Sequence, residues 1–158
     1  MNAQAPLQIV CPRCGAINRI PPGRPAGEAK CGSCHRPLFA GKPLPVDAKS
    51  FDRHIRRNDI PVVVDFWADW CGPCHAMAPA LDRAAAELEP EFRILKLDVE
   101  REQEVAARYG IRSIPTLILF AGGGPVAQTA GAMDALRLVS WIESQAAGIR
   151  DVKPDWES

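Results

Sequence analysis

All six cysteines of this 158-residue chain occur in pairs with two residues between the partners: Cys11/Cys14, Cys31/Cys34 and Cys71/Cys74. In a secreted protein this spacing would favour disulfides, whereas in a reducing compartment it favours metal binding or redox chemistry. The first residues lack both the basic start and the apolar core of a secretory signal, so we expect a cytoplasmic protein. The six thiols are therefore predicted to bind metal, to carry out redox chemistry, or to do both.

The first two pairs are predicted to hold one structural Zn²⁺ per chain. Sixteen residues, an interval that fits a short hairpin, separate Cys14 from Cys31. Each Cys-x-x-Cys turn brings two thiolates to one ion, and two turns complete a tetrahedral shell of Cys11, Cys14, Cys31 and Cys34 that leaves no position for water. Metal binding and folding of residues 7–40 should then be one event. Two disulfides or four free thiols are the alternatives, and His35 is a less favoured substitute ligand.

The segment around these four cysteines cannot build an ordinary core. Residues 1–45 hold eight of the 15 prolines, few large apolar side chains, and six basic residues against Glu28, so their formal charge is +5 and that of the remainder is −5. Such a segment needs a cross-link, such as a metal ion or disulfides, to fold. Its basic residues are scattered without interleaved aromatic residues, which argues against nucleic-acid binding. The chain also has no apolar run long enough to cross a bilayer, so we expect no membrane partner.

The third cysteine pair lies at a predicted junction between a strand and a helix. Residues 60–68 form an apolar, β-branched run, and apolar residues from Met77 to Leu88 recur at helical spacing. Gly72 permits a tight turn and Pro73 is tolerated in a first helical turn. The helix amino terminus would stabilise a thiolate on Cys71, making it the nucleophile. Cys74, three residues on and more enclosed, would be the resolving thiol.

Asp65 is an acid in the middle of the predicted buried strand. Burial without a partner disfavours the ionised carboxylate and raises its pKa, which suits a proton acceptor near neutral pH. A less buried strand with an edge-facing aspartate is the alternative. Lys96 is a lone base in another apolar strand, where it is either a partner for Asp65 or an exposed side chain.

The remaining pattern predicts an α/β fold with a central mixed sheet flanked by helices. Asp47 or Ser50 would cap a helix through Arg57, and Asp134 would cap the last helix. The other expected elements are strands near 61–67 and 92–98, a short helix over 102–109, and a hairpin of strands 117–120 and 126–129. The final residues, including Trp156, are expected to form a frayed tail.

The stretch from Val64 to Cys74 resembles the active-site strand and turn of the thioredoxin family. Pro79 resembles the family's helix-kinking proline, Lys96 its buried lysine, and Ile114-Pro115 its loop with a cis proline. The resemblance implies that four residues contact substrate: Trp70, Ile114, Pro115 and Gly131. It covers about residues 45–147, and the four-cysteine segment before it resembles that of the zinc-containing thioredoxins of bacteria.

Two positions differ from the family pattern. His75, directly after the second redox cysteine, replaces the usual lysine or arginine, so a fixed charge becomes titratable near neutral pH. This change is compatible with a different pH dependence or partner preference. It is equally compatible with a solvent-facing histidine that has no role. The turn over 122–125 is richer in glycine than the family's usual hairpin turn.

These observations predict a thioredoxin that reduces protein disulfides. Its domains would be a zinc segment over 1–44, a thioredoxin domain over 45–148 and a tail over 149–158. Cys71 would attack a substrate disulfide and Cys74 would release the product, its proton accepted by Asp65. The resemblance implies regeneration by an NADPH-dependent thioredoxin reductase, and we expect a monomer. The alternatives are an exported disulfide oxidant or isomerase, a binding adaptor built on the zinc segment, and an oxidative switch based on zinc loss.

Overall fold

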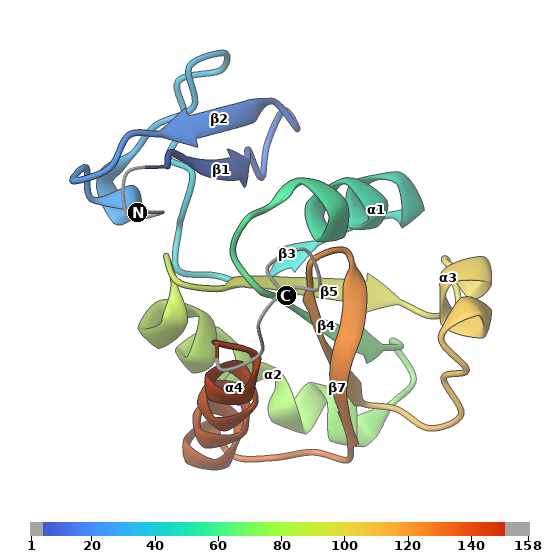
Figure 1. The fold of residues 1–158 in the computed structure, drawn as a ribbon. Coiled ribbons are helices and arrows are strands. Elements are labelled where there is room, and N and C mark those ends of the chain that lie inside the picture. Colours follow the sequence, from blue (N-terminus) through green and yellow to red (C-terminus); the bar gives the residue numbers. More distant parts are fainter. Residues whose placement is uncertain (1–4, 151–158) are drawn as a thin grey trace, which may run out of the picture.

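A computed structural model describes residues 5–150, in which a five-stranded mixed sheet forms the larger part (Figure 1). Its strands, in spatial order, are β3 (Leu44–Pro45), β5 (Arg93–Asp98), β4 (Val62–Trp67), β6 (Thr116–Ala121) and β7 (Gly124–Ala130). The first three run parallel, and β6 and β7 run antiparallel to their neighbours. The predicted mixed sheet is thus confirmed. Trp156, expected in the tail, lies outside the described residues.

Four helices cover the sheet, and side-chain caps fix where two of them begin. They are α1 (Ala48–Arg57), α2 (Gly72–Leu88), α3 (Gln103–Arg108) and α4 (Ala135–Arg150). The carboxylate of Asp47 accepts the Ser50 N–H at 2.8 Å, so Asp47, rather than Ser50, is the cap of α1. Asp134 accepts the Arg137 N–H at 2.9 Å in the first turn of α4. These bonds satisfy amides that have no partner within the helix.

The sheet separates two apolar cores, and the alternation of side chains along β4 assigns each residue to one of them. Val62, Val64 and Phe66 pack with α1 and with Val105 of α3. Val63 packs on the opposite face with α2 and α4. Because successive side chains of a strand point to opposite faces, Asp65 lies on the face that α2 covers. The same alternation places Lys96 of β5 on that face.

The N-terminal segment (residues 5–43) forms a separate small sheet. Strands β1 (Leu7–Val10) and β2 (Ile17–Ile20) pair antiparallel and are joined through the first cysteine turn. The interval between the two cysteine pairs holds β2 and a short 3-10 helix over Ala26–Glu28. The prediction of a hairpin within that interval is therefore wrong. The hairpin instead spans the first pair, because β2 finds its partner in the residues before Cys11.

Three side chains and one backbone amide of the α/β domain complete the outer edge of β1. The Val10 N–H donates to Asn58 Oδ1 at 2.8 Å, and Arg93 Nη2 donates to the Val10 carbonyl at 3.0 Å. The Gln8 N–H donates to Asp59 Oδ2 at 2.7 Å, and the Asp59 N–H donates to the Gln8 carbonyl at 2.9 Å. These bonds satisfy backbone groups along the outer edge of β1, and the N-terminal segment is held next to α1 (Figure 1).

Arg93 is the centre of this contact. It is 2% exposed, pairs with Glu89 at 3.6 Å, and lies 4.5 Å from the centroid of the Phe39 ring. Its contacts and those of Asn58 lie where β4 and β5 begin, whereas Cys71 follows the end of β4. Six strand residues span about 20 Å. The N-terminal segment therefore docks away from the redox cysteines and leaves their surface uncovered.

Candidate dithiol centre and zinc site

The Cys71/Cys74 pair lies where β4 passes into α2. Cys71 is the N-cap of α2, and its Sγ accepts the Cys74 N–H at 3.2 Å. The two residues are joined by a disulfide with their Cα atoms 5.3 Å apart. In the reduced protein the same N–H group and the positive end of the helix dipole would stabilise a thiolate at Cys71. The helix start thus favours Cys71 over Cys74 as the ionised sulfur.

The predicted substrate-contacting residues are grouped beside Cys71. The Ile114 carbonyl lies 3.8 Å from the Cys71 Sγ, and the Ile114–Pro115 peptide bond is cis. The Gly131 N–H donates to the Pro115 carbonyl at 2.9 Å. Trp70, adjacent to Cys71, has 69% of its surface exposed, whereas Cys71 itself is only 3% exposed in this oxidised form.

Asp65 is buried, with 2% of its surface exposed, and its Oδ1 has no hydrogen-bond partner among the described residues. Desolvation raises its pKa from 3.8 to about 7, although the positive charge of Lys96 opposes the rise. Because Asp65 lies on the α2 face of β4, its carboxyl belongs to the same side of the sheet as Cys74. A carboxyl that titrates near neutral pH can exchange protons with a thiol there.

Lys96 is adjacent to Asp65 on the neighbouring strand, with which it is in register. Its Nζ lies 4.5 Å from the centroid of the Trp67 ring, and no ion pair joins it to Asp65 within the described part of the chain. The sequence allowed two interpretations of Lys96, a partner for Asp65 or an exposed side chain, and neither describes it fully. It is half-buried against an aromatic ring and influences Asp65 through its charge.

Two contacts at this centre were not foreseen from the sequence. The Trp70 indole N–H donates to the carboxylate of Glu100, and the His75 ring Nε2 lies 2.7 Å from the Asp69 carbonyl oxygen. Glu100 is thirty residues from Trp70, in the turn after β5, and no local spacing links the two. The unusual residue type at position 75 was the only available signal for the second contact.

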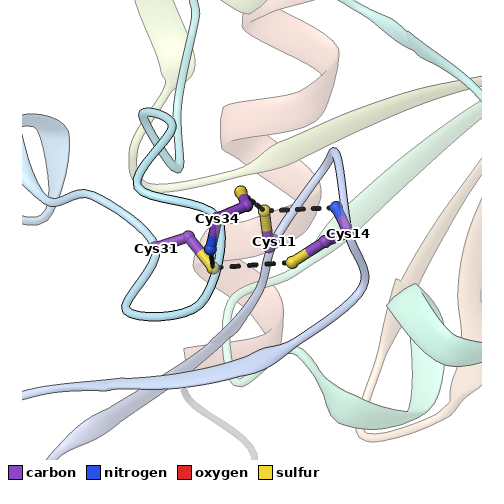
Figure 2. A group of neighbouring side chains, drawn as sticks. All are labelled: Cys11, Cys14, Cys31 and Cys34. Carbon is purple, nitrogen blue, oxygen red and sulfur yellow. Dashed lines mark hydrogen bonds between the residues drawn. The ribbon is translucent and has the colours of Figure 1, made fainter.

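The four cysteines of the N-terminal segment gather at one point, from two separate turns (Figure 2). The Sγ atoms of Cys11 and Cys34 are 3.6 Å apart, as are those of Cys14 and Cys31, and all four lie within 4.8 Å of one another. Tetrahedral Zn²⁺ with Zn–S bonds of about 2.3 Å separates its sulfurs by about 3.8 Å. The donor set therefore fits one zinc ion.

Nitrogen donors stabilise negative charge on two of these sulfurs. The Cys11 Sγ receives the N–H groups of Arg13 and Cys14 at 3.4 and 3.5 Å. Hydrogen bonds from the Cys34 N–H and then the Asn18 side chain lower the pKa of the Cys31 thiol to about 6. Thiolates are the metal-binding form of cysteine, and outer donors of this kind orient them.

The metal also accounts for the charge of the N-terminal segment. Four thiolates around Zn²⁺ carry a net charge of −2, which the formal value of +5 for residues 1–45 does not include. The net charge of residues 1–45 with zinc bound is then about +3.

Removal of zinc is expected to unfold the N-terminal segment, because metal binding and folding are coupled in such small units. Cys31→Ser should contain no bound zinc and should lose amide protection in β1 and β2. Protection in β4 and β5 should remain. Metal analysis and hydrogen exchange read by mass spectrometry test this. The matched control, Cys71→Ser/Cys74→Ser, should retain one zinc per chain, and zinc retained at full stoichiometry by Cys31→Ser would contradict the assignment.

Comparison with known proteins identifies relatives of both parts of the chain. A family model described as thioredoxin matches residues 42–144, and one described as the N-terminal part of thioredoxin 2 matches residues 10–36. Thioredoxin C-3 of Corynebacterium nephridii is 39% identical over 137 residues, covering 87% of this chain and 94% of the relative. A thioredoxin of Pseudomonas aeruginosa is 38% identical over 95 residues, covering 60% of this chain and 88% of the relative.

A solved structure gives the same result for the fold. A mutant thioredoxin from Halobacterium salinarum superposes with a TM-score of 0.62 and is 35% identical, covering 73% of this chain and 97% of that one.

None of the helices described in residues 5–150 has the length and apolar character needed to span a membrane.

Proposed function

This chain belongs to the thioredoxin family and is a thiol–disulfide oxidoreductase with a zinc ribbon at its amino terminus, and from that premise we propose that it is a general reductant of protein disulfides. The observation that carries the proposal is the position of Cys71. Its sulfur caps α2, accepts the Cys74 N–H, and lies beside the Ile114 carbonyl and the exposed Trp70. Gly72 and Pro73 set the helix start that creates this position.

In the first step the Cys71 thiolate attacks one sulfur of a substrate disulfide. A bond forms between Cys71 and that sulfur, and the other substrate sulfur leaves as a thiolate that takes a proton from water. In the second step Cys74 gives its proton to Asp65, directly or through water, and its thiolate attacks the Cys71 sulfur. The bond to substrate breaks, the substrate leaves fully reduced, and the enzyme retains the Cys71–Cys74 disulfide. Lys96 would keep part of the Asp65 population ionised through its charge.

Substrate binding is assigned to the residues around Cys71. The backbone of Ile114 and Pro115 would align an extended segment of the substrate next to the sulfur. Gly131, which has a positive φ of 100° and contacts Pro115, would leave room for that segment. Trp70 would cover it from the other side. These roles are supported by proximity to Cys71 and by the family to which the chain belongs.

Regeneration and location follow from the same chemistry. Thioredoxins are in general reduced by thioredoxin reductase, and we assign an NADPH-dependent enzyme of that class as the partner of this chain. We assign the cytoplasm as its compartment, because both the dithiol and the zinc thiolates require reducing conditions. We also propose a monomer with domains over 1–44 and 45–148 and a tail over 149–158. The family matches over 10–36 and 42–144 support the division into two domains, whereas α4 continues through Arg150, so its last residues overlap the proposed tail.

Reduction of insulin by NADPH and thioredoxin reductase, dependent on catalytic amounts of this protein, tests the proposal. Equilibration with glutathione should give a potential near the value typical of thioredoxins, about −270 mV. Disulfide oxidants have potentials of about −120 mV. A potential in that higher range would instead support an oxidant or isomerase, and insulin reduction that does not depend on the protein would overturn the proposed function.

A further inference from the structure

His75 closes the loop that carries the dithiol. It lies in the first turn of α2, and its Nε2 is 2.7 Å from the carbonyl oxygen of Asp69, six residues earlier. A carbonyl oxygen only accepts hydrogen bonds, so Nε2 must carry the hydrogen and donate it. Both the neutral Nε2–H tautomer and the imidazolium ion meet this condition. The contact therefore does not require a charged ring.

The ring is also held from a second side. It packs edge-on against the Trp67 ring, with centroids 6.1 Å apart and an interplanar angle of 83°. Trp67 is itself half-buried and has Lys96 against its ring. The aromatic contact orients the imidazole so that Nε2 faces Asp69. His75 is exposed to solvent, but its ring makes two contacts, one to the Asp69 carbonyl oxygen and one to the Trp67 ring.

The segment that His75 holds is the one that presents Trp70. Asp69 and Trp70 lie between the end of β4 and the start of α2, and both are exposed. The helix side of this connection is already anchored, because the His75 N–H donates to the Cys71 carbonyl at 3.2 Å. The ring contact adds an anchor on the strand side. Together they fix both ends of the short path through Trp70 and Cys71.

We propose that His75 is a positioning residue that fixes the Asp69–Trp70 segment for polypeptide substrates. The inference rests on the proposed reductase function and names a determinant of its specificity. Because Trp70 is 69% exposed, the hydrogen bond from His75 to Asp69 should affect the contacts that Trp70 makes with the polypeptide around a substrate disulfide. It leaves the thiolate chemistry of Cys71 unchanged, because that depends on the α2 amides and the helix dipole. His75 should therefore change KM for proteins and not the intrinsic reactivity of the dithiol.

Four variants test this, each first checked for zinc content and melting temperature. His75→Leu removes the donor, His75→Asn is too short to reach, and His75→Gln places an amide N–H at nearly the same reach as Nε2. Arg83→Leu, at an exposed position further along α2, is the control for a polar-to-apolar change. Each is assayed with insulin and with a small aromatic disulfide, both in the presence of NADPH and thioredoxin reductase.

His75→Leu and His75→Asn should raise the KM for insulin about three- to tenfold, as expected for loss of one hydrogen bond. Their kcat and their rate with the small disulfide should stay within about twofold of the wild type. His75→Gln should keep the insulin KM of the wild type. The proposal is overturned if His75→Gln is as impaired as His75→Leu, if insulin KM is unchanged in all variants, or if both substrates slow equally. Failure of the unsubstituted protein to reduce insulin would instead overturn the proposed function.

Discussion

Cys71→Ser should abolish insulin reduction, with a loss of at least about a thousandfold, because a serine hydroxyl does not ionise near neutral pH and forms no disulfide. Cys74→Ser should also lose turnover, but for another reason. Its Cys71 thiolate still attacks, and the mixed disulfide then persists because the resolving thiol is missing. Insulin reduction and mass spectrometry of the products under non-reducing conditions separate the two cases.

A trapped covalent adduct should appear with Cys74→Ser and not with Cys71→Ser. Both variants should contain one zinc per chain, which serves as the control for folding of the N-terminal segment. An adduct formed by Cys71→Ser through Cys74 would reverse the roles assigned to the two sulfurs. Turnover retained by either variant would show that the pair does not act together.

Asp65→Asn should stabilise the protein above neutral pH. Burial raises the pKa of Asp65 to about 7 in the folded state, against 3.8 as its ordinary value. Between these pH values the folded state keeps a proton that the unfolded chain has lost, so the free energy of unfolding falls as pH rises. The full penalty, about 4 kcal/mol for this pKa difference, is present above pH 7 and absent below pH 4. Asparagine has no such penalty.

Denaturant unfolding of both proteins at pH 4 and pH 8 measures this effect. The stability difference should be several kcal/mol at pH 8 and small at pH 4. Asp82→Asn, at an exposed position of α2, is the matched control and should change stability by less than about 0.5 kcal/mol. An equal gain at both pH values would show that Asp65 is not the titrating group.

The same substitution should slow the release of product from the mixed disulfide. Loss of a general base typically lowers the rate of a proton-transfer step by about a hundredfold or more. The first step, attack by Cys71, should change little. Single-turnover kinetics with insulin resolve the two steps, and the wild-type release rate should rise with pH through about 7. A release rate that is unchanged in Asp65→Asn would remove this residue from the mechanism.

The docking position of the N-terminal segment determines whether the zinc site can act directly on the dithiol. The segment contacts Asn58, Asp59 and Arg93, where β4 and β5 begin, and Cys71 lies beyond the other end of β4. It therefore does not compete with substrate for the dithiol. Any effect of zinc loss on activity would have to act through the stability of the α/β domain, since Arg93 would lose the carbonyl of Val10. An oxidative switch based on zinc stays a prediction.

Local patterns in the sequence were sufficient to predict much of the fold and of the candidate sites. The four paired cysteines predicted a zinc site because ligand geometry dictates their spacing. Likewise, the dithiol was predicted at a helix start, because an apolar run precedes Cys71 and apolar residues recur at helical spacing after it. Asp65 stood out because a single acid in a β-branched strand is costly to bury. The structure and the family matches confirm the fold, and the family matches confirm the oxidoreductase class that these features indicated.

What could not be predicted depends on residues distant in the sequence. Arg93 looks in the sequence like the first residue of a strand, and its contact with Val10 exists only because a separate sheet docks there. The misplaced hairpin has the same origin, since the pairing of β1 with β2 depends on residues before the first cysteine. The bond from His75 to Asp69 needs the turn between β4 and α2 to be folded first. No periodicity or spacing encodes such contacts.

The rate of alkylation of Cys71 by iodoacetamide, followed against pH in the reduced, zinc-loaded protein, tests the central claim most directly. A thiolate stabilised by the start of α2 should give a midpoint well below the ordinary value of about 8.5, close to the value of about 7 that is typical of thioredoxins, with Cys74 unmodified. A midpoint at or above about 8.5, or preferential labelling of Cys74, would contradict the claim that the helix amino terminus makes Cys71 the nucleophile.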